Sequence, residues 1–115
     1  MKKSIIQEKS FDFSLIIIKL YQKMIDQKEY VLSKQLLRSG TSIGANIEEA
    51  TAGISKKDFI SKMSISSKEA RETRYWLKLI DKSDLVEIDV NEELKLVEDL
   101  INILTSIVKT AQKNI

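Results

Sequence analysis

The chain has 115 residues, the length of one ordinary domain, and its 19 basic and 17 acidic residues leave a net charge of only +2. It contains neither cysteine nor histidine. This excludes disulfide bonds and cysteine-ligated metal sites, and it removes the most common general base and metal ligand. The chain also lacks proline, and its 43% apolar and 31% charged residues are typical of an all-helical protein. We therefore expect an all-α protein that is not an enzyme and has no catalytic residues, metal or cofactor.

The N-terminal region starts with lysines, as a secretory signal does, but the apolar run that follows is too short for a signal peptide. This run extends from Phe13 to Ile18 and is interrupted by Lys19. No other stretch approaches the ~18 consecutive apolar residues that a membrane span needs. We expect a soluble, cytoplasmic protein with no membrane partner.

The first helix is predicted from about Ser10 to Gln27, with Ser10 or Asp12 as its cap, because apolar residues recur there at helical spacing. These residues form two neighbouring seams rather than one. The first seam contains Phe11, Leu15, Ile18 and Ile25, and the second contains Phe13, Ile17, Leu20 and Met24. The doubled seam makes this helix apolar over a wide arc.

The second helix is predicted from about Tyr30 to Gly53, where the glycine is a typical C-terminal stop. Its middle, LLRSGTSIGANIEEA at residues 36–50, could instead be a flexible, phosphate-binding loop. However, no strand precedes it and no Gly-Lys-Ser/Thr ends it, so it does not match a P-loop. An apolar seam continues through the glycines without a phase break, at Leu36, Gly40, Ile43, Ile47, Ala50 and Ile54. We therefore favour a helix.

Each glycine inside a helix costs roughly 0.8–1 kcal/mol relative to alanine. We predict that Ser39, Gly40 and Gly44 offset this cost by admitting a neighbouring helix at close range. The polar residues Arg38, Ser42, Asn46 and Glu49 recur along the flank of the same seam. If they are partly buried they must be paired, so we expect a hydrogen-bond network between helices. A polar ligand or nucleic-acid site is the alternative for these four residues.

The third helix is predicted at residues 55–82, with Ser55 as its cap and Asp58 three residues later. Its core side contains small residues, Ser66, Ala70 and Thr73, among larger apolar ones. A separate face is basic, with one aromatic residue, and comprises Lys57, Lys68, Arg71, Tyr75, Lys78 and Lys82. This face is either a solvated bundle surface or a nucleic-acid-binding site.

The fourth helix is predicted at about residues 90–114, with Asp89 or Asn91 as its cap. It also has two apolar seams, one with Leu94, Val97, Ile101, Leu104, Val108 and Ala111, the other with Leu96, Leu100, Ile103 and Ile107. Together they cover more of the helix than one core needs, which predicts self-association. Charge is also segregated: residues 55–82 carry eight basic and four acidic side chains, whereas residues 83–100 carry one basic and seven acidic ones.

Two blocks of the sequence carry a resemblance to a known family. LSKQLLRSGTSIGANIEEA, followed by SKKDFISKMSISSKEARETRYWLKLI, resembles the 23S ribosomal RNA intervening-sequence proteins, and the similarity extends over about residues 9–110. That family is related to the accessory variability protein of diversity-generating retroelements. The resemblance implies an antiparallel up-and-down four-helix bundle that assembles as a homopentameric ring, and a nucleic-acid-binding role.

Three functions can be compared on these grounds. The first is binding of RNA or DNA through the basic face of the third helix. The second is a protein-interaction scaffold, in which Ile65, Glu69, Glu72 and Trp76 dock a protein partner. The third is an enzyme with a dinuclear metal site, but such bundles use Glu-x-x-His pairs and this chain has no histidine. We favour an oligomer that binds nucleic acid, with the scaffold as the alternative.

Overall fold

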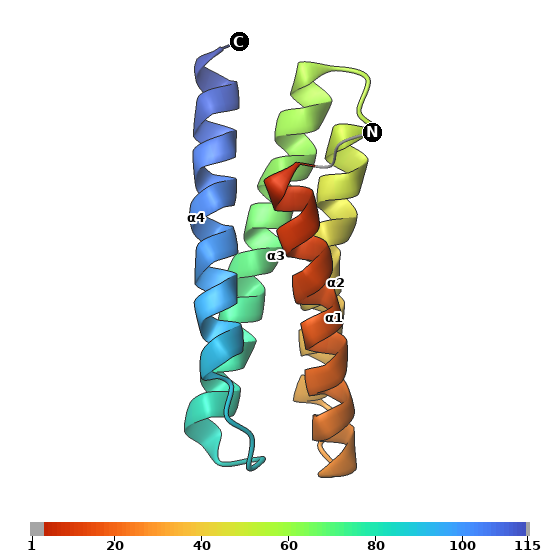
Figure 1. Cartoon of the computed structure of the whole chain (residues 1–115), viewed down its shortest axis with the longest axis vertical. Helices are drawn as coiled ribbons and strands as arrows, with labels where there is room; N and C mark the ends of the chain where they lie inside the picture. Colours follow the sequence, from red (N-terminus) through yellow and green to blue (C-terminus); the bar gives the residue numbers. More distant parts are fainter. Residues whose placement is uncertain (1–3, 115) are drawn as a thin grey trace.

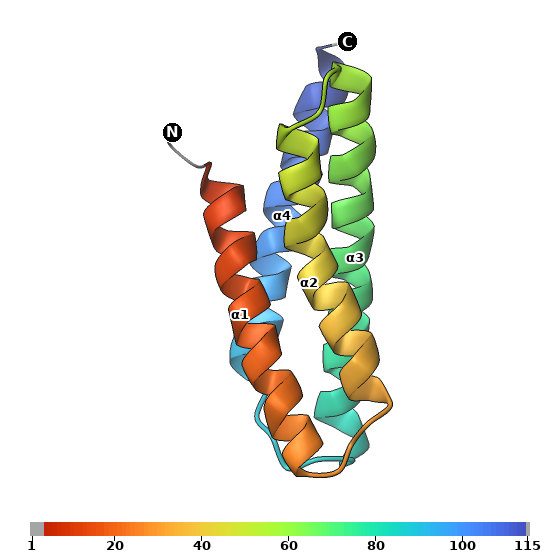
Figure 2. The same ribbon diagram turned by 90° about the vertical axis from the view of Figure 1, so that its right-hand side faces the viewer.

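The periodic segments fold into four helices in the computed structural model, which describes residues 4–114 (Figure 1). The helices are α1 (Ile5–Asp26), α2 (Leu32–Thr51), α3 (Lys56–Ser83) and α4 (Asn91–Lys113). Residues 4–114 contain no strand. Successive helices run in opposite directions, and the bundle measures 47 × 25 × 20 Å (Figures 1 and 2). The chain is therefore an all-α, up-and-down four-helix bundle.

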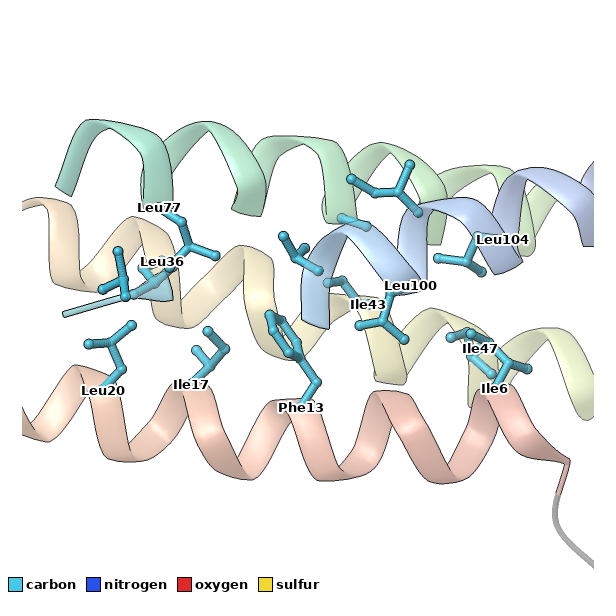
Figure 3. Close-up of a cluster of buried hydrophobic side chains, with 14 of the residues drawn as sticks. Ile6, Phe13, Ile17, Leu20, Leu36, Ile43, Ile47, Leu77, Leu100 and Leu104 are labelled. Atoms are coloured by element: carbon cyan, nitrogen blue, oxygen red, sulfur yellow. The ribbon is translucent and has the colours of Figure 1, made fainter. Parts of the chain in front are cut away.

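Each helix packs against two neighbours. α2 lies between α1 and α3, and α4 contacts α3 and α1 (Figure 2). Apolar side chains from all four helices meet along the central axis (Figure 3). They include Phe13, Ile17, Ile43, Ile47, Leu77, Leu100 and Leu104, each at most 2% exposed. In α1, the second of the two predicted seams supplies the core.

The start of α1 differs from our prediction. The expected caps Ser10 and Asp12 both lie inside the helix, and the helix is capped by Ser4. The Ser4 hydroxyl accepts the Gln7 N–H at 3.3 Å, and the Gln7 side-chain oxygen accepts the Ser4 N–H at 3.0 Å. This reciprocal capping box satisfies two N–H groups and adds Ile6 to the core, which explains why the helix begins earlier.

The starts of α3 and α4 use different contacts. Ser55 caps α3 by accepting the N–H of Asp58 at 3.0 Å, as predicted. Val90, rather than Asp89 or Asn91, occupies the cap position of α4, although Asp89 accepts the Asn91 N–H at 2.9 Å. The nearby charge of Asp89 therefore supports the first turn of α4 without occupying its cap position.

Gly53 follows the end of α2 but does not adopt the left-handed conformation of a typical glycine stop. A Cβ atom at this position would lie 2.7 Å from a carboxylate oxygen of Asp58. A side chain here would displace the Asp58 carboxylate and come within 3.1 Å of the Ala50 backbone oxygen, so the glycine relieves crowding at the end of α2 rather than supplying backbone freedom. Ile54, which was predicted to continue the seam of α2, lies beyond the end of the helix and is fully exposed, because α2 stops at Thr51.

The glycine-containing segment lies inside α2, and its two central glycines are buried and face α1. A Cβ atom on Gly40 would lie 2.8 Å from Cγ2 of Ile17. One on Gly44 would lie 3.4 Å from its closest neighbour, the backbone oxygen of Ser10. The contact at Gly40 is therefore too tight for an added methyl group unless Ile17 moves, whereas the contact at Gly44 has room for one.

Buried hydroxyl groups join α2 to α3. Ser66 donates to the backbone oxygen of Ile43 at 2.8 Å, and the hydroxyls of Thr73 and Ser39 are hydrogen-bonded at 2.9 Å. Among the described residues, no buried side-chain nitrogen or oxygen lacks a partner. Ser39 thus contacts α3, while its neighbour Gly40 contacts α1.

The difference between the two glycine sites provides a test of the packing. Alanine gains the same helix propensity at both sites, but Gly40→Ala also forces Ile17 to move. We expect Gly40→Ala to be less stable than Gly44→Ala by about 1–3 kcal/mol, the usual cost of overpacking. Urea denaturation measures this difference. Equal midpoints for the two variants would show that α1 does not approach α2 this closely.

The N-terminus of α2 carries a charge-dependent cap. Glu29 accepts the backbone N–H groups of Val31, Leu32 and Ser33 at 3.1, 3.1 and 2.7 Å. Burial raises the pKa of Glu29, but these hydrogen bonds together outweigh burial and lower the pKa below its ordinary value of 4.5. The carboxylate therefore stabilises the fold above about pH 4.5, and this stabilisation is lost as the pH falls through the lowered pKa.

We expect Glu29→Gln to lower the free energy of unfolding by about 1 kcal/mol at neutral pH, as loss of a helix cap does. The deficit should shrink as the pH falls below 4.5, because the wild-type carboxylate then becomes protonated. Denaturation at a series of pH values measures this, with Glu48→Gln, an exposed change near the opposite end of α2, as the control. A deficit that does not change with pH would rule out a role for the charge.

Candidate nucleic-acid interface

The six residues predicted on the basic face of α3 all lie on its outer surface. All six are exposed, and we call them the basic stripe: Lys57, Lys68, Arg71, Tyr75, Lys78 and Lys82. Their spacing places them on one side of the helix. The buried residues Ser66, Ala70, Thr73 and Leu77 occupy the opposite side. The core contacts of α3 therefore turn the basic stripe outward.

Within residues 4–114, most cations of the basic stripe have no carboxylate partner. Lys57, Lys68, Arg71 and Lys78 form no ion pair in that range, whereas Lys82 lies 3.7 Å from a neighbouring carboxylate. Arg71 is oriented by a neutral group on α4, because its guanidinium donates to the Thr105 hydroxyl at 3.1 Å. These charges remain available to an anion.

Tyr75 is the one aromatic residue of the basic stripe. Its side chain is 56% exposed, and its ring meets the ring of Trp76 edge-to-face, with 5.4 Å between the centroids. Trp76 is partly buried, and its indole N–H donates to Glu72 at 3.0 Å. Tyr75 therefore presents an aromatic surface that a neighbouring ring helps to position.

A groove between α3 and α4 runs beside the basic stripe. It has a volume of about 590 Å³ and is lined by side chains of both helices, including Arg71 and Arg74 from α3 and Asn102, Ser106, Lys109 and Lys113 from α4. We call it the upper groove, because it lies towards the end of the bundle that is at the top of Figure 1. Lys109 and Lys113 were not among the predicted site residues. They are exposed and four residues apart on one face of α4, and that spacing is the signal that could have identified them.

A second groove lies between the same helices, nearer the α3–α4 connection. This lower groove has a volume of about 520 Å³. Charges of both signs line it, namely the cations Lys78, Lys82 and Lys95 and the carboxylates Asp81 and Glu98. Arg74, at the boundary of the two grooves, donates to both carboxylate oxygens of Glu98, at 3.1 and 2.8 Å. The lower groove is thus partly neutralised.

The connection beyond the lower groove is acidic. Asp84, Glu87 and Asp89 are exposed there, and Glu92 is exposed in the first turn of α4. Burial raises the pKa of Glu93; its own backbone N–H opposes this shift, and the adjacent charge of Glu92 reinforces it. One end of the α3–α4 face therefore carries negative charge and the other positive charge.

The predicted polar residues of α2 lie along its contact with α3. Arg38 forms ion pairs with both Glu69 and Glu72 of α3, the former at 3.2 Å. At the other end, Glu49 lies 3.9 Å from Lys62. Ser42 donates to the backbone oxygen of Arg38 at 2.6 Å, and Asn46 donates to that of Ser42 at 2.8 Å. Arg38 and Glu49 thus join α2 to α3, whereas Ser42 and Asn46 bond to the backbone of α2 itself.

Other kinds of site find less support in the described part of the chain. Residues 4–114 contain no cluster of three or more acidic side chains arranged to hold a metal ion. Glu69 and Glu72 both pair with Arg38, which offsets their charge. None of the four described helices has the length and apolar character needed to cross a membrane. The basic stripe and the adjoining upper groove therefore form the surface whose charge and shape best suit an anionic ligand.

Comparisons with known proteins agree with this fold. The family model for 23S rRNA-intervening sequence proteins matches residues 2–107. A crystal structure of a protein with unknown function from the S23 ribosomal protein family of Bacteroides thetaiotaomicron VPI-5482 is 42% identical in sequence. It superposes with a TM-score of 0.87, and the match covers 91% of this chain and 99% of that one. A search of curated proteins found no significant match.

The family match extends over both sequence blocks that carried the resemblance, and the similar crystal structure has the same overall fold. This chain is a member of the 23S rRNA-intervening sequence protein family.

Proposed function

We propose that this protein is a non-enzymatic homo-oligomer, a pentameric ring, that binds RNA or DNA through the basic stripe of α3. The observation that carries the binding proposal is the exposure of all six stripe residues on one side of α3, where most of the cations have no carboxylate partner within residues 4–114. Lysine and arginine side chains in this arrangement attract the phosphate backbone without regard to sequence. An exposed tyrosine among them can stack on a base.

The proposed oligomer would strengthen this modest basic surface. The net charge of +2 is small for a nucleic-acid-binding protein, so one copy of the stripe gives limited affinity. Several copies in one ring can contact the same strand, and the second and later contacts are then intramolecular. Avidity of this kind can raise the overall affinity by ~10²–10⁴-fold without new contacts.

The surface that favours self-association is on α1 rather than on α4. The apolar residues of α4 are buried or partly buried against the core, so its wide apolar arc is largely covered within one chain. On α1, by contrast, Phe11, Leu15 and Ile18 are 56%, 47% and 38% exposed. They follow one another at helical spacing and form an outward apolar strip, which is typical of a protein–protein interface.

A protein-interaction scaffold is the second function that a specific surface favours. Ile65 is 38% exposed, and it shares the side of α3 that carries Trp76 and the Arg38 ion pairs. Tryptophan and arginine are enriched where partner proteins bind most strongly. A protein that co-purifies after nuclease treatment and a high-salt wash would favour this function over nucleic-acid binding.

Nucleic-acid binding should depend steeply on salt. Each phosphate contact that releases a counterion contributes a slope of about −0.7 for single strands or −0.9 for duplexes to a plot of log K against log salt. We expect a fluorescently labelled oligonucleotide to bind at low salt and to lose affinity with a slope equivalent to several contacts per oligomer. Fluorescence anisotropy measures both quantities. Absence of binding at low salt by the assembled oligomer would exclude this function.

The self-association proposal has its own test. Light scattering should give a mass about five times the 13.2 kDa of one chain. Leu15→Glu together with Ile18→Glu should reduce that mass, because charge would enter the apolar strip of α1. Lys23→Glu, an exposed change on another side of α1 that alters the charge by the same amount, should leave the mass unchanged. A monomeric wild type would overturn the oligomer, and an unchanged mass of the double variant would exclude α1 as the interface.

A further inference from the structure

The charges along the α3–α4 face are distributed unevenly. Among the charged side chains that line the upper groove, Arg74 and Glu98 pair with each other. No other carboxylate lines the groove within the described chain, so Arg71, Lys109 and Lys113 contribute uncompensated positive charge. These three cations come from both walls of the groove. Phosphate groups that enter the upper groove would therefore meet positive charge from two sides.

The lower groove is less suited to phosphate, although it has more lysines. Asp81 and Glu98 line it, and Asp81 lies 3.7 Å from the ammonium group of Lys82. Exposed acidic residues, among them Asp84 and Glu87, follow directly in the connection to α4. Repulsion from these carboxylates opposes the binding of a polyanion at this end of the molecule.

Neutral polar groups complete the upper groove. Thr105 accepts a hydrogen bond from Arg71 at 3.1 Å and so holds the guanidinium at the groove wall. Asn102 and Ser106 also line the groove, and both are exposed. Amide and hydroxyl groups of this kind bind phosphate and sugar oxygens alongside lysine and arginine. The groove thus combines charge with the hydrogen-bonding groups that a sugar–phosphate backbone requires.

The shape of the site favours a single strand. Duplex DNA is usually read by a helix or ribbon that projects into one of its grooves. Here Arg71 and Lys109 line a hollow between two helices instead. A single strand can lie along such a hollow and present its bases to an aromatic side chain. Tyr75 does not line the groove, but it is exposed and lies one helical turn from Arg71, so a base next to a phosphate bound by that arginine can reach it.

We infer that the upper groove binds the phosphate backbone of single-stranded nucleic acid through Arg71, Lys109 and Lys113, with Tyr75 stacking on a base. This inference rests on the proposed nucleic-acid-binding function and assigns it to one part of the surface. It adds two lysines of α4 to the basic stripe of α3. It also reduces the role of Lys78 and Lys82, which lie at the acidic end.

Two matched double variants test the assignment. Lys109→Glu with Lys113→Glu alters the upper groove. Lys95→Glu with Lys23→Glu alters the lower groove and the end of α1 nearest to it, at two lysines outside the basic stripe. Both pairs are exposed, and both change the charge by the same amount. With a labelled single-stranded 20-mer (roughly two site sizes of a typical single-strand binder), the upper variant should lose at least ~10-fold in affinity and the lower variant less than ~3-fold. Tyr75→Ala should weaken single-strand binding more than duplex binding, because only an unpaired base can stack on the ring.

The outcomes separate the inference from the function on which it rests. The wild type could bind while the two double variants lose equal affinity, or while the lower variant loses more. Either result would overturn the assignment of binding to the upper groove and leave the proposed function intact. Tighter binding of the matching duplex would overturn the single-strand assignment. No binding by the wild type would overturn the function and the inference together. If the glutamate variant of the upper groove changes the oligomer mass, Lys109→Gln with Lys113→Gln replaces it, and an unchanged affinity in that variant would also overturn the inference.

Discussion

The close contact between α1 and α2 at Gly40 is the constraint on which the arrangement of the bundle depends. Ile17 occupies the space that a side chain at this position would need, with 2.8 Å between its Cγ2 atom and the place of a Cβ. On the adjoining side of α2, Ser39 is hydrogen-bonded to Thr73 of α3. Adjacent residues of one helix thus set its distances to two neighbours, and α2 determines where both α1 and α3 lie.

The position of α3 in turn determines which of its residues face solvent. Ser66 and Thr73 bond to α2, so the opposite side of α3 is directed away from the bundle. Lys57, Lys68 and the other residues of the basic stripe lie on that side. Because α4 packs beside α3, one edge of the stripe becomes a wall of the upper groove. A buried hydroxyl contact between α2 and α3 therefore helps to define the shape of the surface proposed to bind nucleic acid.

Sequence periodicity predicted the features that depend on a single helix. The seam through Gly40 and the outward basic stripe follow from which residues share a helix face, and that relation is local. The start of α1 at Ser4 was missed, although Ser4 and Gln7 match the capping-box spacing, because the apolar run at Phe11 is the stronger signal. Lys109 and Lys113 were missed for another reason. Their spacing shows that they share one face of α4, but it does not show that this face forms a groove with Arg71 of α3.

The alternating direction of the helices converts the charge order of the sequence into a charge gradient in space. The basic segment of α3 and the acidic segment after it are consecutive in the chain, but α4 runs back along α3 (Figure 1). Lys109 and Lys113 therefore lie towards the same end of the face as the start of α3, far from Asp84 and Glu87. In a closed ring with rotational symmetry, every subunit points the same way along the axis. With the long axis of each bundle along the ring axis, all upper grooves of such a ring would lie at one end and all acidic connections at the other. A strand bound in one groove could then extend into the next without passing an acidic connection.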